Sequence, residues 1–448
     1  MREGSLEPPV RHPIDWTNPD FYDEAALDQE LRRVFDICHG CRRCFNLCDS
    51  FPRLFDLIDA AGDEELGGVD SRDFDKVVDA CTLCDLCFMT KCPYVPPHEW
   101  AVDFPHLMLR HRTVEARKAG IPLQNDLISR TDRNGWLGSM VAPLANWATT
   151  RRNRLARTVI EKVAGVHRDA DLPKFHGKTF AKRAKEAPPQ LSATAPARGR
   201  KAVLYATCFV NYNNPAIGEA TLDVLARNGV ECEVVYPECC GMPQFEQGAL
   251  PRVAQKAKNV AAALLPYIER GYDVVAMVPS CALMLKFEWP LLLPDDPAIQ
   301  TLAQATFDIS EYVVDIAKRE GLAPGLTPLE GGVTVHLACH ARAQNMGPKA
   351  AEMLRLIPGT QVAVVERCSG HGGSWGVMVE NFEVALKVGK PPAQQAAKLG
   401  RRHLASECPL AAAHILQGME RMDGAQPPSE ALHPIQLFAR AYGIGSGG

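Results

Sequence analysis

The sequence lacks the features of several large protein classes. Its start, MREGSLEPPVRHP, has no apolar stretch after its charged residues, so we expect no secretory signal. No apolar run approaches the roughly 18–20 residues that a transmembrane helix needs, and no Gly-x-Gly-x-x-Gly motif follows a predicted strand. The basic stretch has no interleaved aromatics and no nucleic-acid-binding motif. These absences predict a cytoplasmic protein that binds neither nucleotides nor nucleic acid.

Cysteine, by contrast, is abundant, with 16 residues in 448. In a reducing cytoplasm, thiols bind metal more often than they form disulfides. Eight of these cysteines fall in two short runs between residues 38 and 92. The first run, CHGCRRCFNLCD, contains Cys38, Cys41, Cys44 and Cys48, and the second, CTLCDLCFMTKCP, contains Cys81, Cys84, Cys87 and Cys92.

A thiolate at every third position lets a short loop offer three ligands to one 4Fe-4S cluster, and the fourth cysteine of each run ligates the other cluster. This rule predicts one cluster on Cys38, Cys41, Cys44 and Cys92. It predicts a second cluster on Cys81, Cys84, Cys87 and Cys48. Two departures could distort the loops: Asp49 follows Cys48 where proline is usual, and four residues separate Cys87 from Cys92 in place of three.

Two alternatives to iron–sulfur clusters apply to these runs. Structural zinc also uses Cys-x2-Cys units, but it usually takes two closely spaced pairs and not two triplets with a trailing cysteine. Disulfides between thiols three residues apart on one loop are strained. We therefore favour iron–sulfur clusters and retain a zinc-stabilised interaction module as an alternative.

Charge is distributed unevenly along the chain. Residues 1–100 carry 21 acidic and 10 basic side chains, whereas residues 101–200 carry 8 acidic and 19 basic side chains. An acidic face beside clusters suits docking to a basic redox partner. Alternatively, the two segments neutralise each other by packing together.

The first two hundred residues predict two regions. Residues 1–97 read as a Pro-rich arm followed by short helices at 21–35, 51–58 and 74–78, which is the pattern of a helical two-cluster ferredoxin domain. Residues 98–200 read as a mostly helical basic connector that ends in a linker at 186–200.

Within the connector, an apolar stretch from Trp136 to Trp147 is followed at once by four arginines: Arg151, Arg152, Arg154 and Arg157. We expect an apolar helix with a basic continuation, which could lie on an anionic membrane surface, on the inner face of the membrane, or seat a partner protein. The alternative is an ordinary surface helix with a solvated charged end.

After the linker the pattern changes to alternating strands and helices, which implies an α/β fold with parallel strands. The pattern occurs twice, so we predict two tandem repeats at 201–331 and 332–448. The predicted strands lie at 201–207, 232–237, 273–278, 333–338, 361–366 and 403–407, and the predicted helices at 216–229, 259–271, 349–359 and 381–389.

Each repeat places cysteines just after its strands. The first repeat has Cys208, Cys239-Cys240-Gly241 and Cys281, and the second has Cys339, Cys368-Ser369-Gly370 and Cys408. Because the carboxyl ends of parallel strands meet at one sheet edge, we expect these side chains to surround shared or adjacent pockets.

The motif Cys, Cys-Cys-Gly, Cys-x2-Cys, repeated behind a two-cluster ferredoxin, resembles the CCG-domain iron–sulfur oxidoreductases. That family includes subunits of anaerobic glycerol-3-phosphate dehydrogenase, heterodisulfide reductase and lactate or glycolate oxidase. The resemblance extends from Cys38 to Cys408 and includes ACHARAQNMG (338–347) and PSCALMLK (279–286). The phrases CSGHGGSWG (368–376) and SECPLAAAHI (406–415) resemble a subgroup associated with rubrerythrin-like, peroxide-scavenging proteins.

The sequence departs from the family pattern in both repeats. Val278 replaces a family cysteine in the first repeat, which keeps Cys208, Cys239, Cys240 and Cys281. Ser369 and Ala411 replace two in the second, which keeps Cys339, Cys368 and Cys408. We predict one family cluster in the first repeat and a mixed-ligand or degenerate metal site in the second. Its fourth ligand would be His340 or His371, although His371 could equally be a hydrogen-bonded turn residue.

The resemblance implies an electron-transfer protein that works with a dehydrogenase or a peroxide-reducing, rubrerythrin-like partner, with quinone or a thiol/disulfide as a possible acceptor. A flavin or nicotinamide would have to sit on the partner. The alternative is a reductase whose own disulfide, peroxide or carboxylate substrate binds in the CCG repeats.

Overall fold

A computed structural model describes residues 9–62 and 65–445. Residues 1–8, the start of the predicted arm, lie outside this range. From Val10 the arm runs in extended form between the N-terminal helices and the first repeat, since the amide of Val10 donates to Pro96 and the amide of Ile14 donates to Leu291. The arm therefore ties two distant parts of the chain together.

Arg11 of this arm enters a buried cluster of charges. Its guanidinium lies 2.8 Å from Asp85 of the second cysteine run, 2.8 Å from Asp103 and 3.2 Å from Glu288 of the first repeat. Burial opposes ionisation of Asp103, but Arg11 and His106 outweigh it and lower the pKa of that carboxyl to about 2. Burial instead raises the pKa of Asp85, although Arg11 and His106 oppose this shift. The cluster joins three segments of the chain.

The N-terminal region consists of α1 (Glu24–Cys41), α2 (Ser50–Asp59), α3 (Asp75–Asp79) and α4 (Phe104–Ala119). Asp23 caps α1 by accepting from the amide of Ala26, and apolar residues at helical spacing bury one face of that helix. Phe35 contacts Phe74 and Phe104 at ring-centroid distances of 5.1 and 6.0 Å. The three predicted helices of this region are present, and α1 extends through Cys38 and Cys41.

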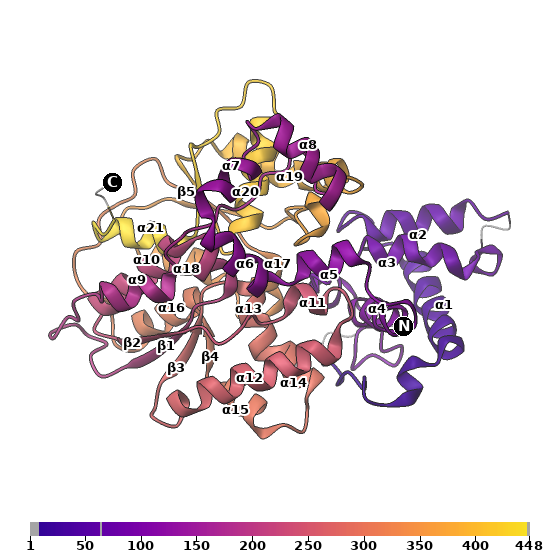
Figure 1. Cartoon of the computed structure of the whole chain (residues 1–448), viewed down its shortest axis with the longest axis horizontal. Helices are drawn as coiled ribbons and strands as arrows, with labels where there is room; N and C mark the ends of the chain where they lie inside the picture. Colours follow the sequence, from indigo (N-terminus) through magenta and orange to yellow (C-terminus); the bar gives the residue numbers. More distant parts are fainter. Residues whose placement is uncertain (1–8, 63–64, 446–448) are drawn as a thin grey trace.

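The connector contains α5 (Leu123–Ser129), α6 (Thr131–Met140), α7 (Ala142–Thr149), α8 (Arg154–Ala164) and α9 (Phe180–Glu186). The apolar stretch that we expected as one helix is two, because the chain breaks at Val141 and Pro143 starts α7. In Figure 1, α7 and α8 lie beside α19 and α20 of the second repeat. Val166 and Met378 form a bridge between these parts.

The two repeats each contain a four-stranded parallel sheet, with strand orders β2-β1-β3-β4 and β6-β5-β7-β8 (Figure 1). The α/β fold with tandem parallel repeats is therefore confirmed. The last strand of each sheet was not predicted, because two or three residues carry no pattern. The strands are β1 (Lys201–Tyr205), β2 (Glu231–Val235), β3 (Asp273–Ala276), β4 (Thr306–Asp308), β5 (Val333–His336), β6 (Val362–Val365), β7 (His403–Ser406) and β8 (Ala431–Leu432).

Helices connect and cover the strands of both sheets. In the first repeat they are α10 (Pro215–Arg227), α11 (Met242–Phe245), α12 (Leu250–Ile268), α13 (Pro279–Leu283), α14 (Trp289–Leu292), α15 (Pro297–Ala305) and α16 (Ile309–Arg319). In the second they are α17 (Cys339–Ala343), α18 (Lys349–Arg355), α19 (Phe382–Leu399), α20 (Pro409–Glu420) and α21 (Pro434–Ala441). Corresponding strands lie in the same order in each sheet, so the repeats present matching carboxyl edges.

One hydrophobic core runs from the N-terminal helices into both sheets, with Phe35, Val203 and Val335 all buried in it. The N-terminal region is therefore packed on the repeats and not tethered beside them. Among the described residues, no helix has the length and apolar character to cross a bilayer.

Candidate metal centres

The first group of thiols lines a small cavity. Cys38, Cys41 and Cys44 come from the end of α1 and the loop after it, and Cys92 comes from the second run. Burial raises the pKa of the Cys38 thiol well above its ordinary value, and the neighbouring thiols of Cys92, Cys44 and Cys41 raise it further. Arg43 and mostly apolar side chains, among them Ile37, Phe51 and Val102, complete the lining. Four thiols around one cavity fit the ligand set of a 4Fe-4S cluster.

The second group combines Cys81, Cys84 and Cys87 with Cys48 of the first run. Burial raises the pKa of the Cys48 thiol, and the thiols of Cys84 and Cys81 raise it further. The loop closes on itself through Leu83 and Asp85, which adopt φ values of 45° and 60°. Backbone amides of Leu83 and Leu86 donate to the sulfurs of Cys81 and Cys84. Such amide donors to sulfur are among the features that set cluster potentials.

The extra residue between Cys87 and Cys92 is accommodated by one turn of π-helix, Cys87–Lys91. The amide of Cys92 donates to the carbonyl of Cys87 at 2.8 Å. At the other departure, Asp49 precedes α2 and its carboxylate pairs with Arg53. Neither change removes a cysteine from its group. Single π-turns are frequent at functional sites.

In the first repeat, four thiols form two close pairs at the carboxyl edge of the sheet. The sulfurs of Cys239 and Cys208 are 3.5 Å apart, and those of Cys240 and Cys281 are 3.3 Å apart. The hydrogen bond with Cys239 raises the pKa of the Cys208 thiol, and burial raises it further. All four predicted residues of this repeat are therefore brought together.

The connector supports this thiol group in a way that sequence reasoning missed. The hydroxyl of Thr131, at the start of α6, donates to the sulfur of Cys239 at 3.1 Å. Asp132 accepts from the amide of Cys239 at 2.8 Å and pairs with Lys256 at 2.5 Å. The indole of Trp289 donates to the carbonyl of Cys240 at 3.2 Å. Thr131 and Asp132 carry no motif spacing, so nothing in the sequence marked them.

In the second repeat, Cys339, Cys368 and Cys408 follow β5, β6 and β7. Burial raises the pKa of the Cys339 thiol, and the thiols of Cys84, Cys368 and Cys408 raise it further. Cys84 belongs to the second cysteine run, so Cys339 of this repeat lies near the second group. The amide of Gly370 donates to the sulfur of Cys368 at 3.4 Å, as Gly241 does to Cys239 in the first repeat.

The glycine-rich loop after Cys368 makes that approach possible. Gly372 has φ 56°, and a Cβ there would lie 2.5 Å from the methyl group of Thr82 in the second run. A Cβ at Gly370 would collide with the carbonyl of Ala385. Only glycine therefore lets this loop touch the second cysteine run while holding its left-handed turn.

A side chain at the same position of each repeat hydrogen-bonds the backbone of that repeat's central cysteine turn. Tyr205 and His336 each stand three residues before the first cysteine of their repeat. The hydroxyl of Tyr205 donates to the carbonyl of Glu238 at 2.6 Å, and Nε2 of His336 lies 2.8 Å from the carbonyl of Arg367. Each carbonyl belongs to the residue just before the central cysteine. Burial lowers the pKa of His336 to about 4.

The two candidate histidine ligands differ in their surroundings. Nδ1 of His340 lies 2.8 Å from the hydroxyl of Ser280, and Nε2 lies 3.2 Å from the carbonyl of Leu83, so both nitrogens are engaged. This histidine bridges both repeats and the second cysteine run. The His371 ring packs edge-on against His414 at 5.7 Å, and burial lowers the pKa of His371 to about 3, so its imidazole is neutral.

Within residues 9–62 and 65–445, no three His, Cys, Asp or Glu side chains converge on a point as the ligands of one metal ion do. A 4Fe-4S cluster contains four irons, and its thiolates stand farther apart than the ligands of a single ion. The fit to clusters therefore rests on the thiols that share one cavity or one buried group.

These features define a protein of two cysteine-rich α/β domains behind a cysteine-rich helical region. A family model described as the cysteine-rich domain, CCG, matches residues 202–286 and 333–415. The chain belongs to this family of iron–sulfur oxidoreductases, as the resemblance of its motifs implied.

Individual relatives agree with this assignment. The chain is 26% identical over 323 residues to the C subunit of anaerobic glycerol-3-phosphate dehydrogenase from Escherichia coli K12, a match that covers 71% of this chain and 77% of the relative. It is 32% identical over 188 residues to lactate utilization protein A of Bacillus pumilus, which covers 40% of this chain and 75% of the relative. The protein of the same name from Bacillus licheniformis is 32% identical over 193 residues.

Proposed function

We propose that this protein transfers electrons through two 4Fe-4S clusters into the cysteine-rich repeats. Cys38, Cys41, Cys44 and Cys92 would hold one cluster, and Cys81, Cys84, Cys87 and Cys48 the other. The observation that carries the proposal is the exchange of the fourth cysteine between the runs, since Cys92 lines the cavity of the first group. When bound, such clusters supply one-electron transfer.

The order of the thiol groups supports a route for the electrons. Burial and the thiols of its own run raise the pKa of Cys87. Cys44 of the first group raises it further. After burial, Cys368 of the second repeat is the first neighbour that raises the pKa of Cys84. Cys408 in turn has Cys281 of the first repeat among its neighbours. The four groups thus form a continuous series, from the N-terminal region through the second repeat to the first.

The two repeats are proposed to differ in what they bind. Four thiols in the first repeat offer the complete ligand set of a family cluster, on Cys208, Cys239, Cys240 and Cys281. The second repeat offers three, and we propose His371 as the fourth ligand of a mixed-ligand or degenerate metal site. His371 is favoured over His340 because both ring nitrogens of His340 are already hydrogen-bonded.

The partner is proposed to be a redox protein, and the names of the relatives favour a dehydrogenase. One relative is named as a subunit of glycerol-3-phosphate dehydrogenase and others as lactate utilization proteins. A rubrerythrin-like partner, favoured by CSGHGGSWG, stays a prediction, as do a quinone acceptor and a peripheral position at the inner face of the membrane.

The test is anaerobic purification followed by optical and electron paramagnetic resonance spectra. We expect a brown protein whose clusters accept electrons from dithionite. Cys92→Ala should remove the signal of one cluster. Cys232→Ala is the matched control, because the sulfur of Cys232 lies 3.6 Å from the carbonyl of Val230, on β2 and apart from the four groups. A colourless protein that contains zinc would contradict the proposal.

Turnover separates the relay from the alternative reductase. The isolated protein should accept electrons without reducing a disulfide or peroxide when an artificial donor is supplied. Steady turnover of either substrate would favour a reductase with its own site in the repeats.

A further inference from the structure

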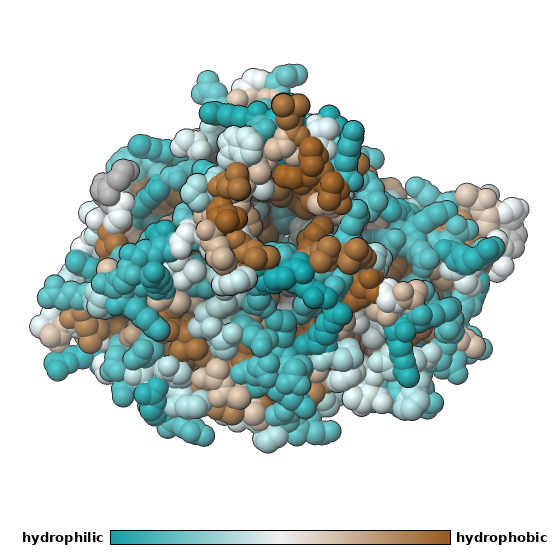
Figure 2. Space-filling model, viewed as in Figure 1, coloured by the Kyte–Doolittle hydropathy of each residue, from teal (hydrophilic) through white to brown (hydrophobic). Residues whose placement is uncertain are grey.

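Large apolar side chains gather on one exposed surface of the connector. We name this surface the connector face. It comprises Leu123 and Leu127 of α5, Trp136, Leu137 and Met140 of α6, Val141, Leu144 and Trp147 of α7, and Leu155, Val159 and Val163 of α8. Figure 2 shows brown side chains gathered around a hollow in this part of the molecule. Such a contiguous exposed apolar surface is a mark of an interaction site.

Helix α8 exposes its apolar face and buries an arginine, which is the reverse of an ordinary surface helix. Its apolar stripe points to solvent, with Leu155 85%, Val159 60% and Val163 71% exposed. Its Arg157 is fully buried, and the guanidinium donates to the backbone carbonyls of residues 149, 167, 168 and 170. A helix that buries arginine and exposes leucine and valine has its apolar face turned toward something outside the chain.

Helix α6 shows the same inversion. Gly135 and Gly138 face inward, where added Cβ atoms would collide with the rings of Tyr212 and Phe175. Trp136 and Met140 face outward and are more than half exposed. Small residues therefore let α6 pack closely on the protein, while its large side chains are left at the surface.

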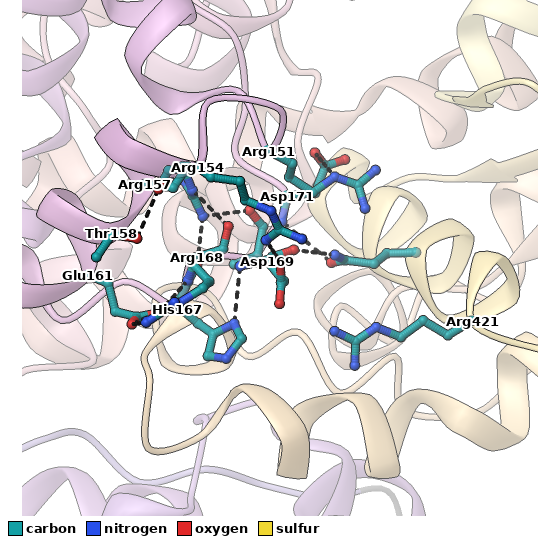
Figure 3. Close-up of polar contacts among 12 residues, drawn as sticks. Arg151, Arg154, Arg157, Thr158, Glu161, His167, Arg168, Asp169, Asp171 and Arg421 are labelled. Carbon is teal, nitrogen blue, oxygen red and sulfur yellow. Dashed lines mark hydrogen bonds and ion pairs between the residues drawn. The ribbon is translucent and has the colours of Figure 1, made fainter.

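Ion pairs neutralise the carboxylates of this region, and one further pair reaches the second repeat (Figure 3). Arg154 pairs with Asp169, and Arg168 pairs with Glu161. Arg151 lies 3.2 Å from Glu420 of α20. Three of the four arginines of this stretch, Arg151, Arg154 and Arg157, are thus engaged by carboxylates or carbonyls of the protein.

Among the described residues of this region, the charged side chains that have no ion-pair partner are basic. Residues 123–163 contain seven basic and three acidic side chains. In the part of the chain that the structure describes, Arg133, Arg152 and Lys162 have no carboxylate within 4.0 Å. Exposed tryptophan, leucine and valine beside unpaired lysine and arginine are the composition of segments that lie in the headgroup region of anionic bilayers.

We propose that the connector face docks on a lipid surface that carries anionic headgroups. The apolar side chains enter the boundary between headgroups and acyl chains, and the exposed Arg152 and Lys162 contact the headgroups. The docking rests on this surface alone and does not require the clusters. Because Thr131 at the start of α6 touches Cys239, docking would bring the thiol group of the first repeat near the lipid surface.

The test is flotation of the full-length, anaerobically purified protein with two kinds of vesicle. One kind contains phosphatidylcholine alone, and the other also contains phosphatidylglycerol. We expect binding to the anionic vesicles and weaker binding at high salt, because screening reduces attraction between exposed charges. Failure to float with either vesicle would overturn the proposal and leave the electron-transfer function untouched, since that function is read from the spectra.

Matched substitutions locate the surface. Leu155→Glu should weaken vesicle binding by roughly tenfold or more, because it replaces a side chain that would be buried in the bilayer. Leu191→Glu is the control, since Leu191 is also exposed but lies outside the connector face. Arg152→Ala should weaken binding about fivefold, as expected for one basic residue near an anionic surface. Lys258→Ala, on α12, should leave it unchanged.

A protein partner is the competing occupant of the connector face. If Leu155→Glu leaves vesicle binding unchanged and instead abolishes association with a purified dehydrogenase partner, the lipid proposal is wrong. Circular dichroism melts should be the same for Leu155→Glu and the native protein, because an 85% exposed side chain contributes little to the fold.

Discussion

The two repeats share one topology but present their thiols differently. In the first repeat, four sulfurs lie in two pairs, 3.5 and 3.3 Å apart, and Thr131 and Asp132 of the connector brace them. In the second, Ser369 replaces one cysteine, and the thiols of Cys339 and Cys368 lie near Cys84 of the N-terminal region. One repeat therefore holds four thiols at its sheet edge, whereas the other holds three and places two of them near the second cysteine run.

The repeats also differ in how they are joined to the N-terminal region. The first repeat is joined through charge, because Glu288 lies in the buried cluster around Arg11. The second is joined through backbone packing, because Gly372 brings its loop onto Thr82. Substitutions at the two junctions should therefore destabilise the protein for different physical reasons.

The largest effect is expected at the charged junction. Arg11→Ala should lower the free energy of unfolding by about 3–5 kcal/mol, since it leaves buried carboxylates without their partner. Denaturant unfolding of the cluster-loaded protein measures this. Arg33→Ala is the control, because its pair with Glu30 is exposed and should be worth about 1 kcal/mol or less. Equal losses from both variants would show that the Arg11 cluster does not join the parts.

The second prediction uses the equivalent anchors His336 and Tyr205. The folded pKa of His336, about 4, is below the ordinary value of 6.5, so the unfolded chain binds the proton first as pH falls. Its contribution is present above pH 6.5 and is lost as pH falls toward 4, by about 3 kcal/mol at most.

His336→Gln should therefore flatten the dependence of stability on pH between these values. Tyr205→Phe should lower stability by about 1 kcal/mol at every pH, because it removes one hydrogen bond and no group that titrates there. Unfolding curves at a series of pH values separate the two. Parallel pH profiles for His336→Gln and the native protein would count against this role of His336.

The third prediction tests the packed junction. Gly372→Ala should destabilise by the cost of a left-handed alanine, about 1–2 kcal/mol, plus a clash with Thr82 of about 1–3 kcal/mol. Gly400→Ala is the matched control, because Gly400 has φ 57° and open space where the Cβ would stand. If the two variants melt alike, the loop does not press on the second cysteine run.

The smallest change in stability is expected from Ser369→Cys, which restores the fourth thiol of the second repeat. The substitution is nearly isosteric, and we expect unfolding curves to stay within about 0.5 kcal/mol of the native ones. Iron content should rise, while Ser369→Ala should not raise it. Unchanged iron in Ser369→Cys would mean that the missing thiol is not what distinguishes the repeats.

Much of this arrangement could be predicted from the sequence because it is periodic or motif-based. The parallel strands, the duplication and the two cysteine runs each repeat a pattern. The strands β4 and β8 were missed because three and two residues form no pattern. The helix expected from Trp136 to Trp147 was interrupted at Val141 by a proline that favours a helix start.

What the sequence could not supply is tertiary. Thr131 reaches Cys239 only because α6 is packed on the first repeat. The proximity of Cys84 to Cys368 depends on the fold of a chain that separates them by 284 residues, and no local spacing encodes it. The outward apolar face of α8 was likewise not predictable, because hydrophobic periodicity places an apolar stripe in the core, whereas Leu155, Val159 and Val163 are exposed.

The most direct measurement of the central claim is the iron content of the anaerobically purified protein and of one cysteine variant in each repeat. A cubane in the first repeat predicts that Cys281→Ala loses about four irons per chain relative to the native protein. The incomplete ligand set of the second repeat predicts a smaller loss from Cys408→Ala. Equal losses from the two variants, or about eight irons in the native protein and in both variants, would contradict the account.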